Sequence, residues 1–376
     1  MKQVLIAFLF FSISAATAQP IEQTDADRQI SFQLFNGNWL KADTLIDLEI
    51  QKNPNHPKYY FFKAHNYFYG RFTSTDGPAR DVTIRAVIHN CWKAIEIGEE
   101  LPQTTEIKFY LGNAYGMLAR ANILAREYWT AYWNSGKCED YLEDVIEEDP
   151  ECYDAYLNHG IQEYFPDAML EGFRYFMAWL GGASGDKETG LEYITKAAEN
   201  GKLLKDEAIY ALAFIYWIGE RNPSKSLLYF EEITQIYPAS ERTNYFHKQM
   251  SFTNTVLEKG TYFLIAERDS LIEKYDVTSP YMLNNAAYQL TEEERFEEAL
   301  TVYELNYELF PNSSYPARAL GTYYTNAEND EKAIEYYKIS FNKVDADTLY
   351  SEPVKIRVKD VLRESLDELG ADIEGL

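Results

Sequence analysis

The chain has 376 residues, of which 46% are apolar, so disorder is excluded as a description of the whole. Asp and Glu number 60 against 35 Lys and Arg, which gives a net charge of −25. Because this balance repels phosphate backbones and anionic membrane surfaces, general nucleic-acid binding is excluded.

The first eighteen residues have the pattern of a cleaved secretory signal. Lys2 gives a positive start, residues 4–11 form an apolar run, and Ala16-Thr17-Ala18 is a small-x-small cleavage site. The run is too short for a membrane span, which needs about 20 apolar residues, and no later segment is apolar enough. We therefore expect cleavage near Ala18, export to the periplasm or the medium, and no transmembrane anchor in the mature chain.

The rest of the chain predicts helices and no strands. Thr105–Asn134 is long and free of proline and predicts one helix, and Cys138–Glu148 predicts a second that ends before Pro150. Arg242–Glu258 and Thr261–Tyr275 are expected to pair around Gly260. The three cysteines fit neither a disulfide framework nor a zinc site, so we interpret them as buried small side chains: Cys91, Cys138 and Cys152.

An internal repeat of 34 residues lies in the C-terminal part of the chain. The period superposes three pairs of residues: Ala287 with Gly321, Ala299 with Ala333, and Tyr303 with Tyr337. The small residues suit close helix crossings, and the tyrosines are expected to fill the space between successive hairpins. This period and pattern resemble the tetratricopeptide repeat (TPR).

The resemblance implies an all-α fold, a right-handed superhelical solenoid of antiparallel helical hairpins with inserts and a C-terminal capping helix. We expect a single domain over 19–376, with the best repeats at 280–313 and 314–347. Weaker units, supported by small residues such as Ala42 and Ser226, are expected around 23–100, 105–165, 186–238 and 240–278. The capping helix is expected at 351–370, with Val354, Val358, Val361, Leu362, Leu366 and Leu369 on its packed face.

The stretch between Pro150 and Lys205 resembles a pattern of some bacterial TPR proteins. It contains Tyr153-Asp154-Ala155-Tyr156, an apolar insert at 173–180 that we expect to pack into the array, and Gly185-Asp186. The glycine-rich loop 181–185 lacks the Gly-Lys pair of a phosphate-binding loop. We interpret it as a turn in which Asp186 caps the next helix.

The resemblance also implies a concave surface, lined by the first helix of each hairpin, that binds peptides. In the register of the repeat, six residues face it: Tyr281, Asn284, Tyr288, Tyr315, Arg318 and Thr322. Some members of the family use a cluster of basic residues to bind the C-terminal carboxylate of a peptide. Arg318 is the only cation among the six residues, so such a cluster is not evident here.

No catalytic, metal or cofactor motif emerges from the sequence. His159 and Glu163 share a helical face, but no third ligand has a matching spacing. Acidic clusters at 143–144, 147–151 and 292–294 predict solvated helix faces that could steer a partner with a basic segment.

Three hypotheses follow. The first is an exported, non-enzymatic TPR scaffold that binds peptide segments or partner proteins in the groove. The second is a glycan-binding helical-repeat protein of the SusD-like type, because aromatic rings stack on sugars. The third is an enzyme with an unrecognised site in the insert 166–187.

Overall fold

The computed structural model describes residues 21–71, 78–168 and 185–371, and within these ranges the chain is helical with no strand. The predicted signal segment and the apolar insert at 173–180 lie outside the described residues. No helix of the described part is long and apolar enough to cross a membrane. The predicted all-α class is confirmed.

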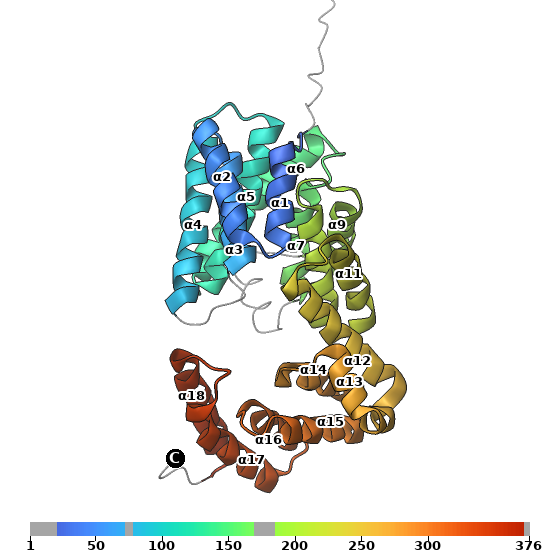
Figure 1. Cartoon of the computed structure of the whole chain (residues 1–376). Coiled ribbons are helices and arrows are strands. Elements are labelled where there is room, and N and C mark those ends of the chain that lie inside the picture. The colour runs from blue at the N-terminus through green and yellow to red at the C-terminus, as the bar shows by residue number, and fades with distance from the viewer. Residues whose placement is uncertain (1–20, 72–77, 169–184, 372–376) are drawn as a thin grey trace, which may run out of the picture.

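Consecutive helices pack in pairs, and the pairs stack into a curved solenoid (Figure 1). The hairpins are α1 (Asp25–Phe35) with α2 (Trp39–Lys52), α3 (Pro57–Arg71) with α4 (Pro78–Glu99), α5 (Thr105–Leu124) with α6 (Tyr128–Glu148), α7 (Ala155–Ala168) with α9 (Lys187–Asn200), α10 (Lys205–Phe214) with α11 (Pro223–Ile236), α12 (Glu241–Ala266) with α13 (Arg268–Tyr275), α14 (Pro280–Glu292) with α15 (Phe296–Leu309), and α16 (Tyr315–Asn326) with α17 (Asp330–Lys343). A π-helical turn (Ile215–Gly219) extends α10, a 3-10 turn (Val344–Ala346) follows α17, and α18 (Glu352–Glu368) ends the array.

Side-chain caps begin many of these helices. Thr24 forms a capping box with Asp27 at the start of α1, and Thr104 accepts a hydrogen bond from the Ile107 amide at the start of α5. Asp186 accepts one from the Thr189 amide, so its predicted role as the cap of α9 is confirmed. These caps satisfy amide groups that have no partner within the helix.

Five hairpins share one turn geometry. Two positions before the second helix, the backbone has a positive φ angle, at Gly37, Arg126, Arg221, Glu294 and Glu328. Five positions after this residue, the second helix carries a small buried side chain: Ala42, Ala131, Ser226, Ala299 and Ala333. The left-handed residue turns the chain back, and the small side chain lets the two helices approach closely.

The prediction of one helix over Thr105–Asn134 is wrong. α5 ends at Leu124, the chain turns at Arg126 with φ 63°, and α6 begins at Tyr128. Gly112 is the close crossing point of this hairpin, since a Cβ atom there would lie 2.7 Å from the Leu142 side chain. The sequence conceals the turn because an arginine, rather than a glycine, takes the left-handed conformation.

The predicted pair around Gly260 is confirmed only in part. Gly260 has φ 76° and ψ 170° and interrupts α12, as expected of a residue without a Cβ atom. Helical structure then resumes, and a second break at Glu267 separates α12 from the short helix α13. The break at Glu267 was not predicted.

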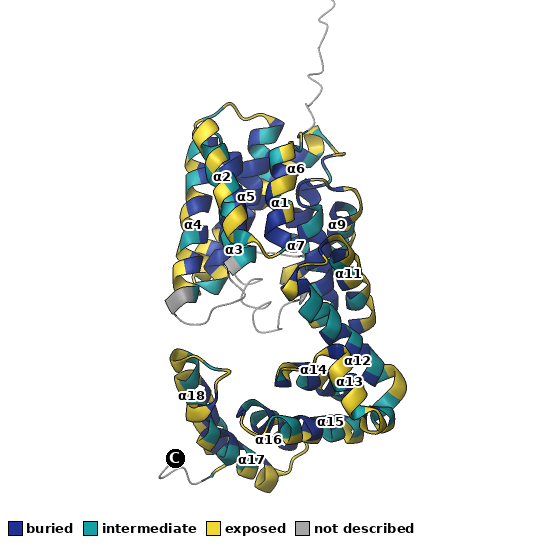
Figure 2. Cartoon of the chain, viewed as in Figure 1, coloured by how far each residue is buried: buried dark blue, intermediate teal, exposed yellow. Residues whose placement is uncertain are grey.

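The buried residues form two clusters, one in an N-terminal block (residues 30–250) and one in a C-terminal arm (residues 252–366). Figure 2 shows them as the dark interior of each part. The first cluster ends at Met250 and the second begins at Phe252, and both residues belong to α12. This helix therefore contributes to both cores and joins the two parts of the solenoid.

The three cysteines are free and buried, as predicted. Burial is the main cause that raises the pKa of the Cys138 and Cys152 thiols to about 12, and it raises the pKa of Cys91 further. Because the thiolate is the reactive form, these side chains act as inert packing groups.

The Ala333→Leu variant tests the close crossing. Ala333 is fully buried in α17, so the added carbons overpack the hairpin, and we expect the free energy of unfolding to fall by about 1–3 kcal/mol. Glu335→Leu, an exposed position of the same helix, is the matched control and should change it by less than about 0.5 kcal/mol. Denaturant unfolding measures the free energy of unfolding of both variants. Equal losses would contradict the assignment of Ala333 to the close helix crossing.

Candidate functional site

Two matching stripes of side chains lie on α14 and α16. The predicted groove residues are spaced three and four positions apart on each helix: Tyr281, Asn284 and Tyr288 on α14, then Tyr315, Arg318 and Thr322 on α16. Residues at this spacing share one helical face. Because the two helices open consecutive hairpins, the period of 34 residues gives each residue of the first stripe a counterpart in the second.

These stripes border a cavity of about 640 Å³. Five of the six predicted residues line it: Asn284, Tyr288, Tyr315, Arg318 and Thr322. Tyr281 lies outside the lining, with its ring centroid 4.6 Å from that of Tyr315. The structure thus brings the predicted residues together, and binding by them stays a prediction.

Helix α18 forms a wall of the cavity that the sequence did not predict. Val361, Leu362 and Ser365 line it. The prediction that Val361 packs in the core is wrong, because its side chain is 44% exposed and faces the cavity, whereas Leu362 and Leu366 are fully buried. Two lysines of α18 bind the turn before this helix. Lys355 donates a hydrogen bond to the backbone carbonyl of Asp345, and Lys359 donates one to its carboxylate.

Aromatic rings make up much of the remaining lining: Phe296, Tyr303, Tyr323 and Tyr337. Phe296 is 51% exposed and Tyr288 is 40% exposed, so both rings offer free surface. Burial raises the pKa of Tyr303 to about 12, and its hydroxyl is a neutral hydrogen-bonding group at physiological pH. The cavity therefore combines aromatic surface with uncharged donors and acceptors.

The six predicted packing residues are all buried: Ala287, Ala299, Tyr303, Gly321, Ala333 and Tyr337. Tyr303 reaches the next hairpin, with its ring centroid 5.7 Å from that of Tyr323. Tyr337 differs from the expectation, since it packs on Gly321 of its own hairpin, where a Cβ atom would lie 2.5 Å from the ring. A glycine at 321 thus makes room for the ring.

Arg318 and Glu292 are the two charged residues of the described lining. Glu292 forms an ion pair with Arg221, whose guanidinium also lies 5.7 Å from the ring centroid of Tyr288. Arg318 has no ion pair with any described carboxylate, and its guanidinium lies 5.1 Å from the ring centroid of Tyr315. The unbalanced charge in the cavity is therefore positive.

The predicted acidic clusters are partly neutralised on their helix faces. Lys108 pairs with both Asp144 and Glu148 at 2.7 Å, and Arg295 pairs with Glu293 at 3.0 Å. The hydrogen bonds to these carboxylates raise the pKa of Lys108.

His159 and Glu163 do not share a ligand site. The His159 ring is buried and stacks on Tyr193 with 5.2 Å between centroids, and burial lowers its pKa. Glu163 instead accepts a hydrogen bond from the Asp186 amide. The described residues contain no cluster of three metal-ligating side chains, and residues 169–184 of the insert lie outside the description.

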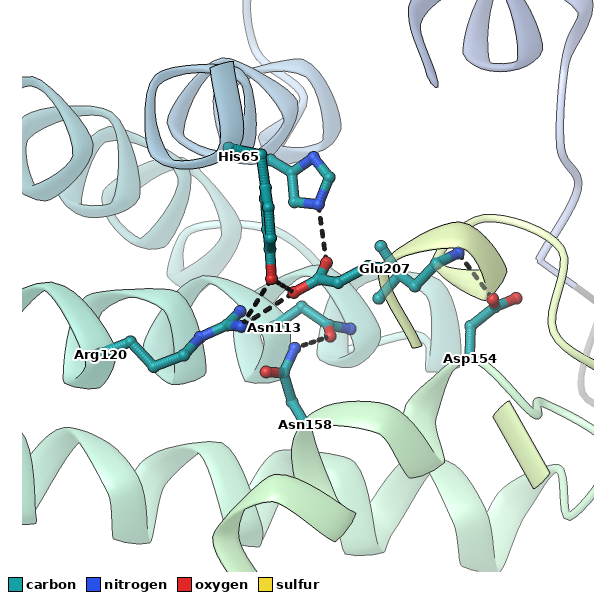
Figure 3. A network of polar contacts seen from close by, with 8 residues as sticks. His65, Asn113, Arg120, Asp154, Asn158 and Glu207 are labelled. Carbon is teal, nitrogen blue, oxygen red and sulfur yellow. Dashed lines mark hydrogen bonds and ion pairs between the residues drawn. The ribbon is translucent and has the colours of Figure 1, made fainter. Parts of the chain in front are cut away.

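A second polar cluster, which the sequence did not predict, lies inside the N-terminal block (Figure 3). Glu207 of α10 is fully buried and binds His65 at 2.7 Å, the Tyr69 hydroxyl at 2.7 Å and Arg120 at 2.9 Å. Burial by itself raises the pKa of Glu207, but Arg120 and His65 outweigh it and lower the pKa to about 2. The carboxylate thus joins α3, α5 and α10, which are far apart in the sequence.

Two further buried contacts lie beside this cluster (Figure 3). Asn158 of α7 donates to Asn113 of α5 at 2.6 Å, and the Asp154 carboxylate accepts from the Lys202 and Leu204 amides. Glu207 and Arg120 bind each other within the protein, although Nε and Nη2 of Arg120 are buried without a hydrogen-bond partner. We interpret Glu207, His65, Tyr69 and Arg120 as a structural clasp of the N-terminal hairpins, and the α14–α16–α18 cavity as the candidate functional site.

No protein-family model and no curated protein matches the chain. Among solved structures, the chain is similar to yeast Tom70, with 16% identity over 93% of this chain and 66% of that chain, and a TM-score of 0.33. It is similar to a tetratricopeptide repeat protein from Parabacteroides merdae, with 11% identity over 90% of this chain and 98% of that one, and a TM-score of 0.33. The TPR domain of P58(IPK) gives 12% identity and a TM-score of 0.25 over 92% of this chain and 99% of that chain. Similarities with such low TM-scores do not support a fold assignment, which follows instead from the helical hairpins of the chain itself.

The Glu207→Gln variant tests the clasp. It leaves Arg120 buried without a counter-ion, so we expect the free energy of unfolding at pH 7 to fall by about 3–5 kcal/mol. The pKa of Glu207 in the folded chain is below its ordinary value of 4.5. Its stabilising effect is therefore complete above about pH 4.5 and is lost as the pH falls toward 2.

Denaturant unfolding at several pH values checks this expectation. The difference between wild type and Glu207→Gln should narrow as the pH falls below 4.5. Glu192→Gln, in an exposed pair with Lys196, is the control and should have little effect at any pH. A wild-type advantage that does not change with pH would show that the carboxylate charge is not its cause.

Proposed function

We propose that this chain is a non-enzymatic interaction scaffold that holds a segment of a partner protein in the groove between α14, α16 and α18. The observation that carries the proposal is the aromatic cavity on the two stripes of repeated residues. Its volume of about 640 Å³ falls within the usual range for ligand pockets, about 300–1,000 Å³. A few side chains of a peptide fill such a space.

The lining suits contact rather than chemistry. Tyr288 and Phe296 present exposed rings, the kind of anchor that dominates protein interfaces. Asn284, Thr322 and Ser365 supply neutral hydrogen-bonding groups around them. Among the described residues of the lining there is no His, Cys, Asp or Lys, and its one carboxylate, Glu292, is paired with Arg221.

A glycan is the second candidate ligand, because sugars also stack on exposed aromatic rings such as Tyr288 and Phe296. The enzyme hypothesis for the insert 166–187 gains no support from the described residues. Attraction of a basic partner segment by the acidic surface stays a prediction.

We also propose that the chain is exported and cleaved after Ala18. The positive start, the short apolar run and the small residues at 16–18 support this. The three free cysteines are compatible with export, because burial shields their thiols from oxidation.

Binding by the groove is tested with Tyr288→Ala. The purified chain is screened against a peptide library and a glycan array, and we expect peptides to bind and the variant to weaken binding by roughly 10-fold or more, as for an aromatic interface anchor. Tyr262→Ala is the matched control, since Tyr262 is 91% exposed and lies outside the lining. Glycan binding alone would replace the proposal with the second candidate, and binding unaffected by Tyr288→Ala would place the site elsewhere.

Export is tested by sequencing the N-terminus of the chain produced in a Gram-negative host. We expect the product in the periplasmic or extracellular fraction to begin at Gln19. Ala18→Phe removes the small residue before the cleavage site and should block processing. A product that keeps Met1 and stays in the cytoplasm would contradict the proposal.

A further inference from the structure

A second cavity, of about 400 Å³, belongs to the N-terminal block and lies apart from the groove. Most of its lining comes from places where helices end or begin: residues 34–38 between α1 and α2, Tyr69 and Gly70 at the end of α3, and residues 239–242 at the start of α12. Tyr210 of α10 completes the lining. Because segments of four different hairpins meet here, the cavity forms only when the whole block folds.

Arg242 is a cation of this lining that lacks a counter-ion. Its Nη1 donates a hydrogen bond to the Tyr69 carbonyl at 2.8 Å, and its Nε is buried without a partner. Its guanidinium lies 5.4 Å from the Tyr210 ring centroid and pairs with no described carboxylate, and burial lowers its pKa. By contrast, the buried Lys58 pairs with Asp27 at 2.6 Å. A sheltered charge without a partner costs free energy, which an anion in the cavity would offset.

Three more polar side chains of the lining are unengaged among the described residues. The side-chain amides of Asn36 and Asn38 make no hydrogen bond there, and Oδ1 of Asn36 is buried. Glu241 is exposed and pairs with no described cation. Because Glu241 and Arg242 are consecutive, with Cα atoms about 3.8 Å apart, two opposite charges border one cavity at short range.

The same cavity has an apolar wall. Leu34, Phe35 and Tyr210 are buried in the lining, and the ring centroids of Phe35 and Tyr210 lie 6.1 Å apart. A ligand held here would place charged groups beside Glu241 and Arg242 and an apolar part against these side chains. The Glu241 carboxylate and the net charge of −25 disfavour a dianion such as phosphate.

We propose that this second cavity binds a free α-amino acid with an apolar side chain. The carboxylate of the ligand accepts a hydrogen bond from Arg242, and its ammonium group donates one to Glu241. The amides of Asn36 and Asn38 offer further donors and acceptors. The proposal goes beyond the peptide groove, because the two sites share no residue and this ligand is a small molecule.

Isothermal titration calorimetry of the full chain tests the site with free leucine and four comparison probes. Leucinamide lacks the carboxylate, 2-hydroxy-4-methylpentanoate lacks the ammonium group, glycine lacks the apolar side chain, and inorganic phosphate is an anion alone. We expect leucine to bind and each of the other probes to bind roughly 10-fold more weakly or worse, the scale of one charge-assisted hydrogen bond or one buried apolar side chain.

Two variants assign the contacts. Arg242→Gln should weaken leucine binding by roughly 10- to 100-fold. Glu241→Gln should weaken leucine but not 2-hydroxy-4-methylpentanoate, whereas a distorted cavity would lose both ligands. Arg268→Gln changes the net charge as much as Arg242→Gln does, on an exposed surface, and should have no effect. Thermal unfolding without ligand checks that all three variants fold.

Three results would overturn the proposal: no leucine binding at millimolar concentration, tighter binding of phosphate than of leucine, or a leucine affinity that Arg242→Gln leaves unchanged. Because the two sites share no residue, these outcomes leave the peptide groove to its own test.

Discussion

The structure depends on the close approach of two helices in each hairpin. A left-handed residue reverses the chain, and a small buried side chain five positions later lies where the helices cross, as at Glu294 and Ala299. Without this contact a hairpin cannot bury its apolar face, and the next hairpin has no surface on which to stack. The geometry recurs in five hairpins, although only two of them have clear repeat signatures in the sequence.

The groove is a consequence of this stacking. The 34-residue period sets α14 and α16 in equivalent places, so polar and aromatic stripes of equal spacing meet at one surface. Helix α18 then folds beside them and turns a surface into a cavity. The fully buried Leu362 anchors the helix, while the neighbouring Val361 remains exposed in the cavity. One helix thereby serves both as the end of the core and as a wall of the site.

The sequence predicts the parts of this arrangement that repeat. The period places Ala299, Ala333 and the stripe residues without knowledge of any contact. It does not predict the wall from α18, because that depends on bonds of Lys355 and Lys359 to Asp345 after a turn. It does not predict the clasp either, since His65 and Glu207 are 142 positions apart. Arg126 conceals a hairpin turn because its residue type gives no signal for a left-handed backbone.

The central claim is that a partner segment lies between α14, α16 and α18. Hydrogen exchange of the full chain, measured with and without a bound peptide, tests it most directly, because slower exchange maps the contact along the chain. The account predicts protection concentrated in residues 280–292, 315–326 and 352–368. Protection confined to the N-terminal hairpins, with the C-terminal helices unchanged, would contradict it.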